Sequence, residues 1–214
     1  MAAHGSNAQP CEEALWGQLR ESRIAILDTW FCNMLTTELR RYKASKKKSG
    51  FAWNNIIKNY VLGNVHNRST NLAWYKDVDT VYLPMNWGKR HWVALVIRLR
   101  KGNIFVLDPL IINTPPKKVP HLMRPVIDLL PVIVKEFVDP ALVDCPLPHV
   151  FSLERLPNVY QNDRTGDCGP LAVKFIELHA LKVMPDSLTE DLVDKLRMSY
   201  AVDVYQEFVV PLTN

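Results

Sequence analysis

The apolar residues of this chain first follow a helical pattern. Between Glu13 and Tyr42 they recur mostly at steps of three and four, which is typical of helices with one buried face. Asp28 and Thr29 stand where a second helix would begin, and an aspartate at that position can cap free backbone amides. The pattern predicts helices throughout this region.

Strand patterns follow. Residues 78–83 predict one strand, which Pro84 should end because proline supplies no amide hydrogen for a ladder. Continuous apolar runs at 93–97 and 104–107 predict two central strands covered by helices on both faces. Residues 101–103, Lys-Gly-Asn, supply turn chemistry between them, so an antiparallel pair inside an α+β domain is expected.

The second half of the chain is rich in proline. Nine of the fifteen prolines lie between Pro109 and Pro148, which predicts an irregular connection with one amphipathic helix at 126–137. Residues 150–156 alternate imperfectly like a strand. A mostly buried helix is then expected over 171–181, with Pro170 at its first position, where the missing amide hydrogen costs nothing.

Composition narrows the class of protein. Hydrophobic residues make up 48% and charged residues 22% of the 214 residues, as in ordinary globular domains. We expect a flexible tail over residues 1–12 and one domain over 13–214. No stretch reaches the ~18 apolar residues of a membrane helix, and residues 1–10 lack the apolar middle of a secretory signal. These observations predict an intracellular protein, nuclear or cytoplasmic, with no membrane partner.

The net charge of +4 comes largely from one local run. A solvated loop is the simplest interpretation, with a nuclear-import signal or contact with nucleic acid as the open alternatives. No nucleic-acid-binding motif accompanies the run, so nucleic acid is not an expected partner. The run consists of Arg40, Arg41, Lys43, Lys46, Lys47 and Lys48.

The cysteines do not form a metal or disulfide pattern. Cys11, Cys32, Cys145 and Cys168 are too scattered for a disulfide framework or a zinc knuckle, so neither a metal nor a cofactor is expected. Cys168 differs from the others because it stands at the mouth of a predicted buried helix. Free amide groups and the helix dipole favour a thiolate there, and glycines at 166 and 169 remove side-chain bulk around it.

A thiol nucleophile needs a base and a residue that orients the base. His91 begins one buried strand and Asp108 ends the next, where a carboxylate would be costly to bury without a partner. We therefore expect His91 and Asp108 to pair. With Lys101-Gly102 as a two-residue loop, however, Asp108 would face Leu95, so a bulge or bend at the strand end is required.

A fourth candidate is Gln161. Its side-chain amide could donate to an oxyanion alongside the backbone amide of Cys168. An ordinary solvated loop glutamine is the alternative.

At this point the sequence resembles the ubiquitin-like-protein-specific cysteine proteases, the SUMO-protease family, and more distantly the adenovirus protease. The matching segments occur in the order His, Asp, Gln, Cys over about residues 78–181. They are Val81 to Asn86, His91 to Leu95, Ile104 to Asp108, Gln161-Asn162 and Asp167-Cys168-Gly169.

This resemblance implies a papain-like α+β fold with permuted motif order and a central, mostly antiparallel sheet flanked by helices. It implies that Trp92 covers a narrow channel for a Gly-Gly tail, although a core tryptophan is an equal alternative. Pro109 and Pro170-Leu171 depart from the family pattern. The early Trp-Leu-x-Asp segment has its best counterpart at residues 26–28, Ile-Leu-Asp, which lacks the ring.

The function expected from the resemblance is cleavage after the C-terminal glycines of a ubiquitin-like modifier by a Cys-His-Asp mechanism, by a protein that is monomeric. Two alternatives stay open. The style of the sequence is similar to copies in plant transposable elements, so the chain could be a catalytically silent module that binds a modifier. An acetyltransferase using the same three residues is the other.

Overall fold

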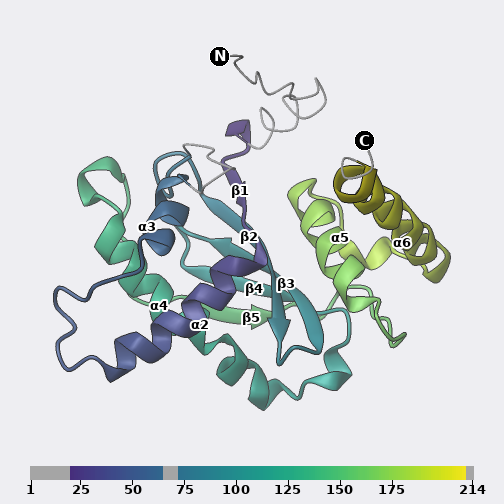
Figure 1. Ribbon diagram of the computed structural model, residues 1–214, viewed down its shortest axis with the longest axis horizontal. Coiled ribbons are helices and arrows are strands. Elements are labelled where there is room, and N and C mark those ends of the chain that lie inside the picture. The colour runs from purple at the N-terminus through teal and green to yellow at the C-terminus, as the bar shows by residue number, and fades with distance from the viewer. Residues whose placement is uncertain (1–19, 65–71, 211–214) are drawn as a thin grey trace.

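The structure is a computed structural model that describes residues 20–64 and 72–210. Its centre is a five-stranded sheet with the strands in chain order (Figure 1). The two inner pairs, β2 with β3 and β3 with β4, are antiparallel, whereas the edge strands β1 and β5 join their neighbours in parallel. The strands are β1 (Ile24–Ile26), β2 (Thr80–Trp87), β3 (His91–Arg98), β4 (Asn103–Leu107) and β5 (Ser152–Arg155).

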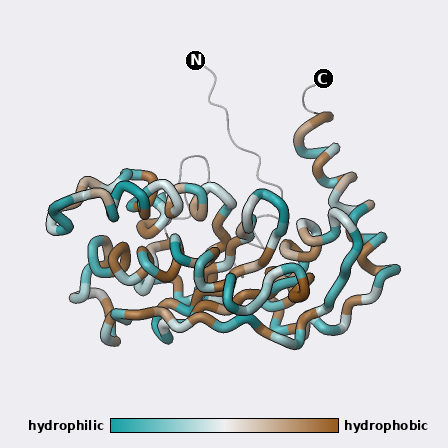
Figure 2. Tube along the Cα trace, turned by 90° about the horizontal axis from the view of Figure 1, so that it is seen from below, coloured by the Kyte–Doolittle hydropathy of each residue, from teal (hydrophilic) through white to brown (hydrophobic). Residues whose placement is uncertain are grey.

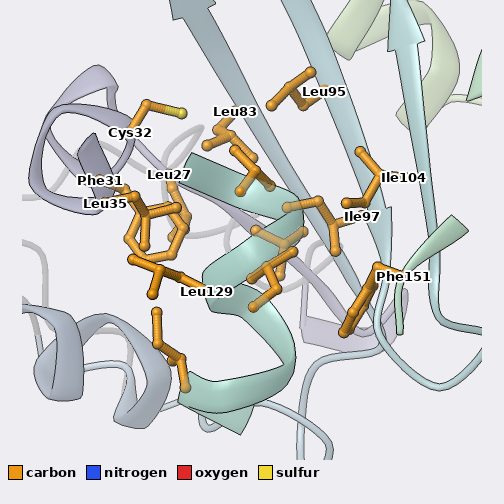
Figure 3. Close-up of a cluster of buried hydrophobic side chains, with 14 of the residues drawn as sticks. Leu27, Phe31, Cys32, Leu35, Leu83, Leu95, Ile97, Ile104, Leu129 and Phe151 are labelled. Atoms are coloured by element: carbon orange, nitrogen blue, oxygen red, sulfur yellow. The ribbon is translucent and has the colours of Figure 1, made fainter. Parts of the chain in front are cut away.

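Helices cover both faces of the sheet, as the continuous apolar runs predicted. On one face α2, α3 and α4 build the larger core, in which Phe31 and Leu129 meet Leu95 and Ile104 (Figure 3). On the other face α5 packs Leu171 and other apolar residues against alternate positions of β3 and β4. The helices are α2 (Thr29–Ala44), α3 (Asn55–Leu62), α4 (Val119–Phe137), α5 (Cys168–Ala180) and α6 (Glu190–Val204). Short 3-10 turns lie at Ile111–Asn113, Pro116–Lys118, Pro140–Leu142 and Pro185–Ser187, and a π-helical turn lies at Tyr205–Val209.

The N-terminal prediction was correct for one helix and wrong for the segment before it. Asp28 caps α2, because its Oδ1 accepts the Trp30 amide at 2.9 Å. Residues 24–26, however, form β1, which pairs in parallel with β2 through Ile24 opposite Thr80. Helix α3 was not predicted, and the predicted tail over residues 1–12 lies outside the described residues.

The prediction that Pro84 ends its strand was wrong. Strand β2 continues to Trp87, and Pro84 pairs with Ala94 of β3. The backbone of Tyr82 faces β1, since its carbonyl accepts the Leu27 amide, and the two-residue alternation of a strand turns Pro84 to the same side. Because β1 ends at Ile26, the missing amide hydrogen of Pro84 faces an open edge and breaks no ladder.

The helix predicted at 126–137 is longer than expected: α4 begins at Val119 and continues through Pro125 and Pro131. An interior proline costs a helix about 3 kcal/mol or more. Burial of one apolar side chain returns about 1.5–3 kcal/mol, and α4 buries a whole stripe of them against the core. The stripe comprises Val119, Met123, Val126, Leu129, Leu130, Ile133 and Val134. Its burial outweighs the cost of the two prolines.

Candidate active site

The β3–β4 hairpin brings His91 and Asp108 together. The β3 and β4 strands pair with Arg98 opposite Asn103 and Ala94 opposite Leu107. The turn therefore spans residues 99–102, which differs from the predicted two-residue loop. The observed register carries Asp108 toward Val93, on the same face as His91, so the predicted bulge is not needed. The His91 Nε2 lies 2.7 Å from Asp108 Oδ1, which confirms the expected pairing.

Asp108 is completely buried. Its Oδ1 also accepts the Leu110 amide at 2.9 Å, and its Oδ2 lies 3.1 Å from Nη1 of Arg155. Burial alone would raise the pKa of the Asp108 carboxyl, but the hydrogen bonds from His91 and Leu110 and the charge of Arg155 outweigh it and hold that pKa below its usual range. The Asp108 side chain is therefore an ionised carboxylate that accepts hydrogen bonds.

The charge of Asp108 defines the tautomer of neutral His91. An ionised carboxylate can only accept, so the hydrogen between the two groups belongs to Nε2 of His91. The other ring nitrogen, Nδ1, is then the basic one. This is the arrangement that a general base held by a carboxylate requires.

Cys168 stands at the N-terminus of α5. Helix α5 begins at Cys168, and Asp167 is its N-cap. Pro170 is thus the third residue of the helix, two positions later than predicted, and its missing amide hydrogen still falls in the first turn, where amides lack an intrahelical acceptor. The partly exposed Cys168 side chain lies beside these free amides and the positive end of the helix dipole.

Cys32 is a different kind of thiol. Its side chain is buried in the core beneath α2, and that burial raises its pKa to about 12. Such a thiol is protonated and shielded at neutral pH. Cys168 is therefore the better nucleophile of the two.

Trp92 connects the start of β3 to the start of α5. A Cβ built on Gly169 would lie 3.7 Å from Cδ1 of Trp92, so the indole ring rests against the backbone of the helix mouth. Trp92 follows His91, and Gly169 follows Cys168. The contact places the start of β3 against the start of α5. Trp92 itself is half-buried.

Gln161 lies beside this group but is turned toward the loop after Asp108. Its Nε2 donates to the backbone oxygens of Asp108 at 2.8 Å and Val159 at 3.2 Å, and its Oε1 accepts the Ile111 amide at 2.8 Å. Both amide hydrogens are engaged by these acceptors. Donation to an oxyanion would require the side chain to turn away from the loop.

Asp167, the residue before the nucleophile, is completely buried and heavily bonded. Its carboxylate binds Arg164 at 2.9 Å, Arg197 of α6, and Nδ2 of Asn162 at 3.1 Å. Arg164 also binds Asp194 of α6. These contacts fasten the loop before Cys168 to helix α6, which lies next to α5 (Figure 1).

A shallow groove of about 620 Å³ borders the loops after Asp108 and before Cys168. Its lining is mainly apolar, and Ile112 at its rim is 86% exposed. The lining residues are Leu110, Ile111, Ile112, Gln161, Asn162 and Asp163.

Sequence reasoning missed Arg155 and the role of Asp167. Arg155 is the next-to-last residue of the predicted strand at 150–156, and a charge near the end of a predicted strand was the only available signal. The counterpart of the Trp-Leu-x-Asp segment, residues 26–28, joins β1 to α2. There Asp28 accepts the Tyr60 hydroxyl at 2.6 Å in addition to capping the helix.

Residues 20–64 and 72–210 contain neither a membrane-spanning helix nor a metal-binding cluster. No helix in these ranges has the length and apolar character needed to cross a bilayer. The same ranges contain no group of three or more His, Cys, Asp or Glu side chains arranged to hold a metal ion.

Comparison with known proteins identifies the family of this chain. A sequence model of the Ulp1 protease family, C-terminal catalytic domain, matches residues 14–212. No curated protein matches the chain in sequence.

Solved structures of the SUMO protease Ulp1 share the fold. One, with its catalytic cysteine oxidised to a sulfenic acid, is 14% identical and superposes with a TM-score of 0.53 over 86% of this chain and 71% of that one. Another, the Ulp1 protease domain in complex with Smt3, the yeast ortholog of SUMO, is 15% identical with a TM-score of 0.51 over 86% and 69%. The chain belongs to the Ulp1 protease family, as a cysteine-protease catalytic domain of the α+β type.

Proposed function

We propose that this domain hydrolyses the peptide or isopeptide bond after the C-terminal glycine of a ubiquitin-like modifier, with Cys168 as nucleophile, His91 as general base and Asp108 as the residue that orients His91. The observation that carries the proposal is the buried hydrogen bond of 2.7 Å between His91 and Asp108. Trp92, the residue after His91 in β3, packs against Gly169 at the start of α5.

The chemistry proceeds through a thioester. His91 takes the thiol proton, and the Cys168 sulfur attacks the carbonyl carbon of the terminal glycine. The C–N bond breaks as the imidazolium returns a proton to the leaving amine. Water then adds to the thioester carbon while His91 accepts its proton. Cleavage of the C–S bond releases the carboxylate of the modifier and restores the thiol.

The oxyanion would form at the mouth of α5. The backbone amide of Cys168 lies in the first turn, where amides have no intrahelical acceptor, and it can donate to the developing negative charge. We assign this role first to the amide. Gln161 can join it only after releasing the Asp108 and Val159 carbonyls.

Two lines of support favour a glycine-ended modifier. Membership of the Ulp1 family is one, and the fold shared with the Ulp1 domain bound to Smt3 is the other. Trp92 could provide one flat wall of a slot too narrow for residues that carry a Cβ. Exposed Ile26 stands where the family resemblance suggests a second wall, so that wall would be aliphatic.

The test uses activity-based probes. Purified protein is incubated with a panel of SUMO and ubiquitin proteins in which propargylamine replaces the C-terminal glycine. The alkyne then stands where the scissile carbonyl would be and traps a reactive thiol as a vinyl thioether. At least one probe should add its full mass to the protein, and Cys168→Ala should abolish the addition.

Cys145→Ala serves as the matched control, because Cys145 is also a partly exposed free thiol but packs near Arg100, away from the site. This variant should react like the wild type. Failure of every probe, or labelling that persists in Cys168→Ala, would contradict the proposal.

A further inference from the structure

Arg155 reaches the active site from the far edge of the sheet. Strand β5 pairs in parallel with β4, and Arg155 lies opposite Val106, two residues before Asp108. The Arg155 side chain is only 10% exposed. An arginine is rarely buried to this degree without a partner that needs its charge.

The two oxygens of Asp108 have different partners. Oδ1 receives hydrogen bonds from His91 and Leu110, whereas Oδ2 faces Nη1 of Arg155 at 3.1 Å. A free carboxylate can rotate and exchange its oxygens. The guanidinium on Oδ2 opposes that rotation and leaves Oδ1 in line with the imidazole.

Arg155 is itself held in place by backbone carbonyls. Its Nη1 donates to Thr114 at 2.8 Å and lies 3.5 Å from the Ile111 oxygen, both in the loop that follows Asp108. Gln161 binds the same loop through the Asp108 carbonyl and the Ile111 amide. The guanidinium therefore has little freedom to move away from Asp108.

The charge of Arg155 also compensates the buried charge of Asp108. Neutral His91 leaves Asp108 as an uncompensated negative charge in a dry site, which is costly to bury alone. Among the described residues, the titratable or charged groups placed against Asp108 are His91 of β3 and Arg155 of β5. Arg155 is the permanent positive charge of this pair.

We infer that Arg155 is a positioning residue for the reaction: it fixes the Asp108 carboxylate so that Oδ1 holds the His91 imidazole in its working orientation. The inference rests on the proposed roles of His91 and Asp108. It extends the catalytic arrangement to a third strand of the sheet.

The test combines a spectroscopic signal with kinetics. A ring N–H held by a buried carboxylate gives a far-downfield proton resonance, which is visible without any substrate. Arg155→Met should weaken or lose this resonance for His91 and lower kcat on a cleavable modifier by about 10- to 100-fold, with KM little changed. Arg155→Lys, which keeps the charge, should retain more of both signals.

Arg100→Met is the matched control, because Arg100 is a partly buried arginine bonded to Asp79 and to a backbone carbonyl, outside the site. It should lower stability without changing the His91 resonance or kcat. Arg155→Gln replaces Arg155→Met if that variant does not fold.

The outcomes separate this inference from the proposed function. A protein that cleaves no modifier would still show whether the resonance depends on Arg155. The inference is overturned if folded Arg155→Met keeps the wild-type resonance and kcat, or if Arg155→Lys is as impaired as Arg155→Met.

Discussion

Asp108 and Asp167 are both fully buried carboxylates that bind arginine. Asp108 shares its oxygens between Arg155 and His91, whose side chains are 10% and 9% exposed. Asp167 binds Arg164 and Arg197, whose side chains are 35% and 45% exposed. The partners of Asp108 are thus shielded from water, while those of Asp167 remain partly hydrated.

This difference suggests a catalytic role for Asp108 and a structural role for Asp167. A carboxylate whose partner is an imidazole can fix which ring nitrogen carries the proton, because an ionised carboxylate only accepts hydrogen bonds. A carboxylate bound only by arginines and an amide holds groups that act only as hydrogen-bond donors to it. We therefore expect changes at Asp108 to act mainly on catalysis and changes at Asp167 to act mainly on folding.

Asp108→Asn should have the largest effect. The amide can present a hydrogen to Nε2 of His91 and so favour the wrong tautomer, while the shape of the site is preserved. We expect kcat to fall by about 10³- to 10⁴-fold, measured by release of a fluorescent amine from a glycine-ended modifier. A loss of less than about tenfold would show that Asp108 does not orient the base.

Asp167→Asn should act on stability instead. It removes the charge that Arg164 and Arg197 share, so the free energy of unfolding should fall by about 1–3 kcal/mol, measured with urea at neutral pH. Arg197→Gln should cost less, at most about 1 kcal/mol, because Arg164 remains and exposed ion pairs contribute little. A larger loss of kcat in Asp167→Asn than in Asp108→Asn would reverse the comparison.

The smallest expected effect is a pH dependence. Because the pKa of Asp108 is lower in the folded state than in the unfolded chain, its ionised form stabilises the fold fully above about pH 4. That contribution is lost as the pH falls through the lowered folded-state pKa. Asp108→Asn lacks it, so the stability difference between wild type and variant should narrow from pH 5 to pH 3 in urea unfolding. A constant difference would contradict the lowered pKa.

Local sequence patterns predicted the central strands of the fold. They failed where contacts between distant segments determine the secondary structure. The runs at 93–97 and 104–107 identified β3 and β4, and Asp28 identified the start of α2, because each signal is contained in neighbouring residues. Residues 24–26 fit a helical period equally well, and only pairing with β2 makes them a strand. Pro84 is tolerated because it faces an open edge, and the prolines of α4 because that helix buries an apolar stripe. Both reasons depend on tertiary structure and cannot be predicted from neighbouring residues.

The same limit applies to the site. The His91–Asp108 contact could be predicted because both residues are polar ends of adjacent buried strands. Arg155 could not be assigned, since the parallel pairing of β5 with β4 joins segments far apart in sequence. The orientation of Gln161 depends on where the loop at 108–111 places its carbonyl and amide groups, which composition and spacing do not encode.

The β3–β4 hairpin has a consequence for how the protein folds. His91 and Asp108 are only 17 residues apart, whereas Cys168 follows them in the chain after the whole of α4 and β5. Short loops close at a smaller entropic cost, so the hairpin should form early and α5 should dock late. In the proposed active site, a partly folded chain then holds the imidazole and its carboxylate before the thiol is placed, so cleavage of a peptide bond would require the completed domain.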